Sequence, residues 1–125
     1  MDDEKRNSTR PDTPLFDDIL TLSYKGKQYV VDQNKPDVDF GREEDNDIVV
    51  EHTLVSRKHA TVEFRLGKFV LNDHSTNGTY LKAEGEKTVH VHWRRTFLEG
   101  SGVIIPALDK ERRHSEVIRY STGKK

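Results

Sequence analysis

Residues 61–73 read Thr-Val-Glu-Phe-Arg-Leu-Gly-Lys-Phe-Val-Leu-Asn-Asp. Polar and apolar side chains alternate from Thr61 to Leu66, which is the period of a strand with one buried face. Gly67-Lys68 then supplies a turn signal, and a second apolar run begins at Phe69. The segment is therefore predicted to form a β-hairpin.

Short apolar runs also lie on both sides of this hairpin. Ile19 to Tyr24, the turn Lys25-Gly26-Lys27, and Gln28 to Val31 predict a second hairpin. No stretch shows the sustained i, i+3, i+4, i+7 spacing of an amphipathic helix. Many short strands separated by turns predict an all-β sandwich or barrel. The other strand candidates are residues 48–50, 88–93 with Val89, Val91 and Trp93 on one face, 103–105 and 117–120.

The composition supports one domain that is rich in β-structure. The 125 residues suit a single core, valine is the commonest apolar residue, and alanine occurs only three times. Leu, Ile, Val and Phe make up 31 residues and the net charge is −1, which argues against global disorder. The absence of cysteine excludes disulfides and thiolate metal ligands. The balanced charge gives no support to nucleic-acid binding, which needs a basic excess.

The chain is predicted to have one folded body with a polar segment at each end. Residues 1–14 carry charges, two prolines and no large apolar residue after Met1, so we expect a disordered tail. The β-sandwich is expected over residues 15–120, followed by a short tail at 121–125. No apolar run is long enough for a signal sequence or a membrane span, so we expect a cytoplasmic protein without membrane contact.

Three polar loops interrupt the strand pattern. They contain Gly41-Arg42, Ser56-Arg57-Lys58-His59 and Ser75-Thr76-Asn77-Gly78-Thr79. Gly41 can adopt a backbone conformation that a Cβ would forbid, and Asn77-Gly78 is the strongest short turn signal in the chain. Because loops cluster at the ends of a sandwich, these three can meet at one apex. Their guanidinium, hydroxyl and amide donors suit an oxyanion such as phosphate.

In this order and spacing, the Gly41-Arg42, Ser56-x-x-His59 and Ser75-to-Thr79 motifs resemble forkhead-associated (FHA) domains, and the resemblance covers about residues 16–120. The resemblance implies a β-sandwich of about eleven strands whose apical loops bind phosphothreonine peptides. It also implies a non-enzymatic signalling module without a cofactor, whose partner is a protein that carries phosphothreonine. The alternative is an interaction domain of the same fold whose degenerate site does not bind phosphate.

The resemblance also implies a role for each motif residue. Arg42 would pair with the phosphate, Ser56 would donate its hydroxyl to it, and Arg57 would add a backbone amide, with its side chain as an optional second contact. Thr76 would bind or support the phosphate, and Asn77 would hold the peptide main chain. The residues expected to shape the loops without touching the ligand are Gly41, Gly78 and His59, whose hydrogen bond across the loop base would orient Ser56.

Two features depart from the family pattern. Ser101 and Pro106 stand where the family's late motif has an acid and a glycine, so we expect a changed turn away from the binding loops. Glu43-Glu44-Asp45 directly follows Arg42. This acidic triplet would oppose a phosphate unless it points outward, or it would select a basic residue in the ligand.

Two residue patterns leave alternatives open. His90 and His92 could ligate a metal, but no third ligand is identifiable, and a solvated strand face is favoured. Ser56, His59 and Asp73 supply the residue types of a hydrolase triad, but no G-x-S-x-G elbow accompanies them.

The N-terminal segment adds a hypothesis about self-association. Thr9-Arg10-Pro11-Asp12 carries an acid three residues after a threonine, a ligand position that family members often read. A phosphorylated Thr9 could therefore occupy the binding loops of its own or a neighbouring molecule.

Overall fold

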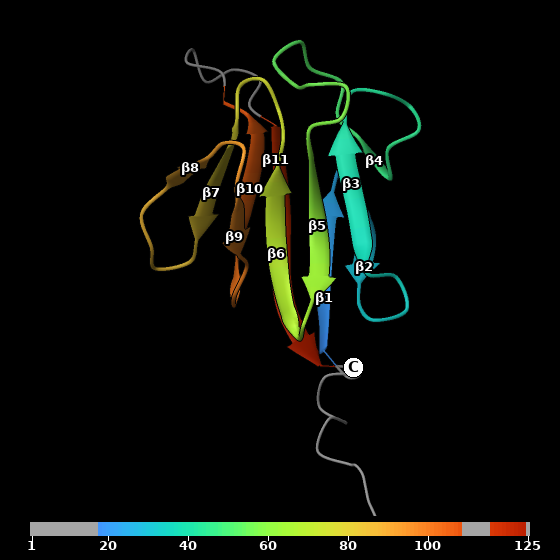
Figure 1. The fold of residues 1–125 in the computed structure, drawn as a ribbon, viewed down its shortest axis with the longest axis vertical. Helices are drawn as coiled ribbons and strands as arrows, with labels where there is room; N and C mark the ends of the chain where they lie inside the picture. The colour runs from blue at the N-terminus through green and yellow to red at the C-terminus, as the bar shows by residue number, and fades with distance from the viewer. Residues whose placement is uncertain (1–17, 109–115, 125) are drawn as a thin grey trace, which may run out of the picture.

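The computed structural model describes residues 18–108 and 116–124. These residues form eleven β-strands in two sheets, and they contain no helix that could cross a membrane. Figure 1 shows β3, β5 and β6 in front of β1 and β11, as the two layers of a sandwich. The predicted all-β sandwich of about eleven strands is confirmed. The expected tail at residues 1–14, including Thr9, lies outside the described residues.

Each sheet is defined by the order of its strands. The six-stranded sheet runs β2 (Lys27–Val31), β1 (Asp18–Tyr24), β11 (Glu116–Lys124), β10 (Ser101–Ala107), β7 (Thr79–Ala83) and β8 (Val89–Val91). The five-stranded sheet runs β4 (Ile48–Val49), β3 (Asp37–Gly41), β5 (Ala60–Arg65), β6 (Lys68–Asp73) and β9 (Arg95–Phe97). Only β3 and β4 pair in parallel; the other described pairs are antiparallel.

The hydrophobic core lies between the two sheets. Leu20, Leu22 and Tyr24 of β1 are buried, whereas the residues between them are half-buried. In the other sheet, Val38 and Phe40 of β3 follow the same alternation. This period of two is expected of strands that turn one face toward a core. The largest fully buried side chains include Phe40, Leu20, Leu22, Ile48, Leu71, Leu98, Ile104, Ile118 and His59.

Both predicted hairpins are confirmed, and each turns on two residues with positive φ. Lys25 and Gly26 have φ values of 49° and 82°, and Leu66 and Gly67 have values of 52° and 79°. Two successive positive φ values give the tight turn whose twist matches a hairpin. The hairpins β1–β2 and β5–β6 therefore form where the glycine signals predict them.

Several strand boundaries differ from the sequence-based expectation. β11 continues to Lys124, which pairs with Asp18, so residues 121–124 are part of a strand and the expected tail there is wrong. β3, β7 and β9 were not predicted: β3 interleaves its apolar residues with acids, β7 has one large aliphatic side chain, and β9 has only three residues. β8 ends at Val91, and Trp93 is 70% exposed with φ 56°, so Trp93 does not share the buried face of Val91.

The two unusual residues of the late motif lie at opposite ends of β10. Ser101 begins the strand, and its hydroxyl donates to Glu84 Oε1 at 2.8 Å. Pro106 lies where the β10–β11 register shifts, a place where a missing backbone N–H is tolerated. Its neighbour Ile105 pairs with Tyr80 at the start of β7, so the expectation that both residues lie far from the loops is wrong for Pro106.

The register of the strands brings the three polar loops to one end of the sandwich. Phe40 near the end of β3 pairs with Ala60 at the start of β5, and Ala60 also pairs with Asp73 at the end of β6. The loops of residues 42–47, 50–59 and 74–78 all leave from these strand ends. They therefore lie together at the same end of the molecule, at the top of Figure 1.

Candidate functional site

Backbone hydrogen bonds join loop 42–47 to loop 50–59. The Arg42 N–H donates to the Ser56 carbonyl at 2.9 Å, and the Glu43 N–H donates to the Arg57 carbonyl at 3.3 Å. The buried Asn46 side chain donates to the carbonyls of Glu43 and Arg57, both at 2.8 Å. These contacts hold Arg42 and Ser56 beside each other.

Gly41 allows the two loops to approach this closely. A Cβ at this position would lie 2.2 Å from the Arg57 carbonyl oxygen, far inside van der Waals contact. Gly41 is not among the residues with positive φ, so the expectation that it adopts a conformation forbidden to other residues is wrong. The close approach of another backbone segment explains the glycine.

His59 connects loop 50–59 to loop 74–78 from inside the sandwich. Its ring is fully buried and stacks on Phe40, with 5.8 Å between the ring centroids. Its Nδ1 accepts the Ser56 N–H at 3.0 Å, and its Nε2 lies 3.0 Å from the Gly78 carbonyl oxygen. Because a carbonyl only accepts, Nε2 carries the proton and the ring is neutral. Burial lowers the pKa of His59 and favours this neutral form.

The residues named as ligands also contact the loops beside them. The Thr76 N–H donates to Ser56 Oγ at 2.9 Å, and Asn77 Nδ2 donates to the Leu54 carbonyl at 3.1 Å. The second contact occupies one donor of the Asn77 amide, which was expected to hold a peptide main chain. The structure brings all five named residues to one end of the sandwich: Arg42, Ser56, Arg57, Thr76 and Asn77.

Two adjacent side chains keep donors available after the loops have formed. Arg42 donates from Nε to the Val55 carbonyl at 3.0 Å, and its Nη1 and Nη2 have no hydrogen-bond partner among the described residues. The Ser56 hydroxyl accepts a bond from Thr76 and can still donate its own proton. Two guanidinium nitrogens beside a hydroxyl match the acceptor oxygens of a phosphate group.

The buried Asp73 carboxylate holds the base of loop 74–78. Its Oδ1 accepts the hydroxyls of Ser75 and Thr79 at 2.9 and 2.7 Å. Its Oδ2 accepts the N–H groups of Ser75 and Trp93 at 3.2 and 3.0 Å. Burial by itself would raise the pKa of Asp73, but these hydrogen bonds outweigh it and lower the pKa. Asp73 is therefore charged and serves as the acceptor around which the loop folds.

The arrangement of Ser56, His59 and Asp73 is not that of a hydrolase triad. His59 Nδ1 accepts the backbone N–H of Ser56, whereas a triad requires the ring to accept the serine hydroxyl. Asp73 accepts no hydrogen bond from His59, whose ring nitrogens bond to Ser56 and Gly78, and its oxygens accept the hydroxyls and N–H groups of Ser75, Thr79 and Trp93. These three residues support the loops.

His90 and His92 contribute to the site in a way that the sequence did not reveal. His90 Nε2 lies 2.9 Å from the Asn77 carbonyl oxygen, and His92 Nε2 lies 3.1 Å from the Ser75 carbonyl oxygen. The favoured interpretation, a solvated strand face, is therefore incomplete. The part of the chain that the structure describes contains no group of three His, Cys, Asp or Glu side chains placed to hold a metal. Only the i, i+2 spacing could have indicated that the rings of His90, in β8, and His92, directly after it, lie on the same side.

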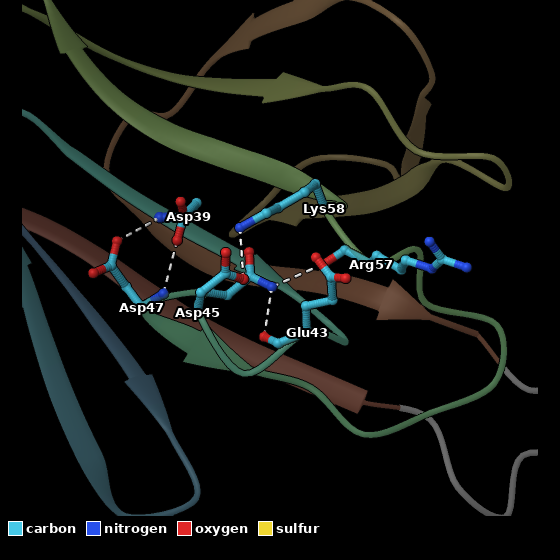
Figure 2. Close-up of polar contacts among 7 residues, drawn as sticks. Asp39, Glu43, Asp45, Asp47, Arg57 and Lys58 are labelled. Atoms are coloured by element: carbon cyan, nitrogen blue, oxygen red, sulfur yellow. Dashed lines mark hydrogen bonds and ion pairs between the residues drawn. The ribbon is translucent and has the colours of Figure 1, made fainter.

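Figure 2 shows the acidic side chains beside the site. Asp45 forms an ion pair with Lys58 at 2.7 Å, and the hydrogen bond from Lys58 lowers the pKa of Asp45. Asp39 and Asp47 accept each other's backbone N–H groups, at 2.7 and 3.0 Å. Because Lys58 compensates one charge of the acidic triplet, the triplet opposes an anion less than its sequence suggests.

Comparison with known proteins finds a match in sequence for part of the chain. The FHA domain family model matches residues 38–92, a segment that contains all three loops. No curated protein matches the chain.

Solved structures share the fold over most of the chain. The FHA-1 domain of Mycobacterium tuberculosis Rv1747 has a TM-score of 0.64 at 24% identity, covering 86% of this chain and 99% of that one. The N-terminal FHA domain of S. cerevisiae Rad53p, in complex with a phosphothreonine peptide, has a TM-score of 0.60 at 18% identity, covering 86% and 94%. The FHA2 domain of Rad53, in complex with a phosphotyrosyl peptide, has a TM-score of 0.66 at 16% identity, covering 87% and 79%.

At these identities the structural likeness shows the fold, and the family model adds a match in sequence. The resemblance to forkhead-associated domains is therefore confirmed, by the sequence of residues 38–92 and by the fold of the described chain.

Proposed function

We propose that this chain is a non-enzymatic module that binds phosphothreonine in a partner protein through loops 42–47, 50–59 and 74–78. The observation that carries the proposal is the pairing of Arg42 and Ser56, which lie beside each other and keep donors that no other described residue binds. FHA structures of the same fold contain phosphothreonine or phosphotyrosyl peptides, which supports a phosphorylated ligand.

Charge gives the proposed ligand its advantage over the unmodified peptide. A phosphothreonine carries a charge of about −1.5 to −2 and three strong acceptor oxygens. Each hydrogen bond to a charged group contributes about 1.5–3 kcal/mol, so three of them supply about 5–9 kcal/mol. The ordering of the peptide offsets part of this gain, which leaves affinity in about the micromolar range.

A peptide titration tests the proposal directly. A library of phosphothreonine peptides, and the same peptides without phosphate, would be titrated against the wild-type protein by fluorescence polarisation. We expect micromolar binding that requires the phosphate and weakens as salt concentration rises. Arg42→Ala should lower the affinity at least about tenfold, because it removes charge-assisted hydrogen bonds.

Two controls make the result specific. Arg119→Ala removes an exposed arginine from β11 in the other sheet and should leave binding unchanged. The urea unfolding free energy of Arg42→Ala should fall by no more than about 1.5 kcal/mol, because the exposed Arg42 loses only the hydrogen bond from Nε to the Val55 carbonyl. A wild-type protein that binds no phosphopeptide would instead support the alternative, an interaction domain whose site is blocked by Glu43 and Glu44.

Self-association is a second proposal, and it concerns the same loops. A Thr9-phosphorylated chain would occupy the loops of its own or a neighbouring molecule and compete with added phosphopeptide. An unchanged peptide affinity and an unchanged oligomeric state after phosphorylation of Thr9 would exclude it.

A further inference from the structure

Histidine side chains contact the backbone carbonyls of loop 74–78. Three of its carbonyl oxygens each lie within hydrogen-bond distance of a histidine Nε2. The pairs are His92 with Ser75 at 3.1 Å, His90 with Asn77 at 2.9 Å and His59 with Gly78 at 3.0 Å. Because carbonyls only accept, each Nε2 is a donor, and each histidine fixes a different peptide unit of the same loop.

His90, in β8, and His92, directly after it, belong to a stack of rings. The His90 ring lies 4.6 Å from the Tyr80 ring and 5.7 Å from the His92 ring, with interplanar angles of 25° and 30°. Tyr80 and His90 are also paired residues of β7 and β8. The stack restricts the rotation of both imidazoles, so their Nε2 atoms point at the loop before any ligand arrives.

Gly78 gives independent evidence of how closely His90 approaches the loop. A Cβ on Gly78 would lie 2.1 Å from His90 Nε2, and Gly78 has φ +87°. The glycine of the Asn-Gly turn is therefore needed for two reasons, its left-handed backbone and the imidazole packed against it. The loop and the His90 ring are therefore packed closely against each other.

We propose that His90 and His92 are positioning residues for phosphopeptide binding, because they fix the loop that carries Thr76 and Asn77. This inference rests on the proposed function of the site. The Thr76 N–H holds the Ser56 hydroxyl, so a displaced loop 74–78 would also release Ser56 from its position beside Arg42. His90 and His92 act through the loop and make no contact with the phosphate in this mechanism.

Substitutions at His90 separate the hydrogen bond from the ring. His90→Phe keeps an aromatic ring for the Tyr80 stack but removes the donor. His92→Phe likewise keeps a ring for the stack on His90 and removes the donor to the Ser75 carbonyl. His90→Gln removes the ring and keeps an amide donor of similar reach. We expect each Phe variant to bind phosphothreonine peptide about three- to tenfold more weakly, the effect of one hydrogen bond, and His90→Gln to recover within about threefold of the wild type.

Amide hydrogen exchange in the absence of ligand measures how often loop 74–78 opens. The Thr76 and Gly78 amides, which donate to Ser56 Oγ and Ser75 Oγ, should exchange faster in the Phe variants. The Leu98 amide, which donates to the Phe69 carbonyl outside the three loops, should not change. Thr88→Ala, at an exposed position before β8, is the matched control and should leave both measurements unchanged.

The outcomes distinguish this inference from the proposed function. Phe variants that keep wild-type affinity and wild-type exchange overturn it, and so does a His90→Gln variant that is as impaired as His90→Phe. If the wild-type protein binds no phosphothreonine peptide, the proposed function fails, and faster exchange of the Thr76 and Gly78 amides still decides whether the histidines fix the loop. If His90→Phe does not fold, His90→Asn, whose amide is too short to reach, replaces it as the variant without a donor.

Discussion

Replacing His59 with phenylalanine would test whether one buried ring holds two of the loops together. Phenylalanine retains the planar ring and its stack on Phe40, so the change is confined mainly to the hydrogen bonds. Two buried or half-buried backbone groups lose their partners, the Ser56 N–H and the Gly78 carbonyl. The substitution therefore measures the hydrogen bonds rather than the volume of the side chain.

The size of the effect follows from these two contacts. A buried polar group left without a partner costs about 1–3 kcal/mol, so the two together cost about 2–6 kcal/mol. His59 has a relative exposure of 0%, so water cannot replace the lost partners without opening the loop base. We expect His59→Phe to lower the free energy of unfolding by about 3 kcal/mol, a large part of the stability of a small domain.

Urea unfolding followed by the fluorescence of Trp93 measures this difference, and His74→Phe is the matched control. His74 is the first residue of loop 74–78 and is partly exposed, and the structure assigns its side chain no hydrogen bond among the described residues. We expect the control to stay within about 0.5 kcal/mol of the wild type, as surface substitutions usually do. A His59→Phe variant as stable as His74→Phe would refute the proposed role of the buried hydrogen bonds.

Three further predictions concern pH and the two glycines. Burial lowers the pKa of folded His59 below its ordinary value of about 6.5. The neutral ring therefore contributes fully to the unfolding free energy above that pH, and this stability is lost as the pH falls toward the folded pKa. Over that range, the unfolding free energy of the wild type should decrease more than that of His59→Phe. Gly41→Ala should destabilise the domain by at least about 2 kcal/mol in urea unfolding, since its Cβ would meet the Arg57 carbonyl, and an unchanged midpoint would contradict this. Gly78→Ala should cost less stability when His90 is also alanine, and additive losses in that double-mutant cycle would show that the imidazole is not the obstacle.

The sequence predicted most clearly the strands whose signals, polar alternation and a turn, lie within one short segment. The hairpins β1–β2 and β5–β6 combine alternation with a glycine turn, so neither needs a distant partner to be recognised. β9 exists because Val70 to Asn72 of β6 pair with it, and its sequence of three residues carries no such pattern. Trp93 was misplaced for a related reason, because its N–H is bound by Asp73 and this contact bends the chain away from the β8 ladder.

The site shows the same division between local and distant information. Motif spacing was enough to predict that Arg42, Ser56 and the Asn-Gly turn lie at one end of the sandwich, because their residue types suit a proposed anion site and loops cluster at sandwich ends. The need for Gly41 comes from the Arg57 carbonyl, which is sixteen positions later in the sequence and adjacent only in the fold. The role of His90 likewise depends on the pairing of β7 with β8, which places its ring beside the Asn77 carbonyl of loop 74–78.

The hydrogen bonds within the loops determine which donors of Arg42 and Ser56 remain for a ligand. Ser56 donates its N–H to His59 and accepts from Thr76, so its hydroxyl oxygen is fixed while its proton stays available. Arg42 donates its N–H and Nε to neighbouring carbonyls, so the guanidinium is held by its near edge and presents its far edge. A ligand that binds these groups therefore meets donors that are already oriented, and little conformational entropy is lost on binding. This explains why we expect changes at His59 and His90, which touch no ligand, to weaken binding as well as stability.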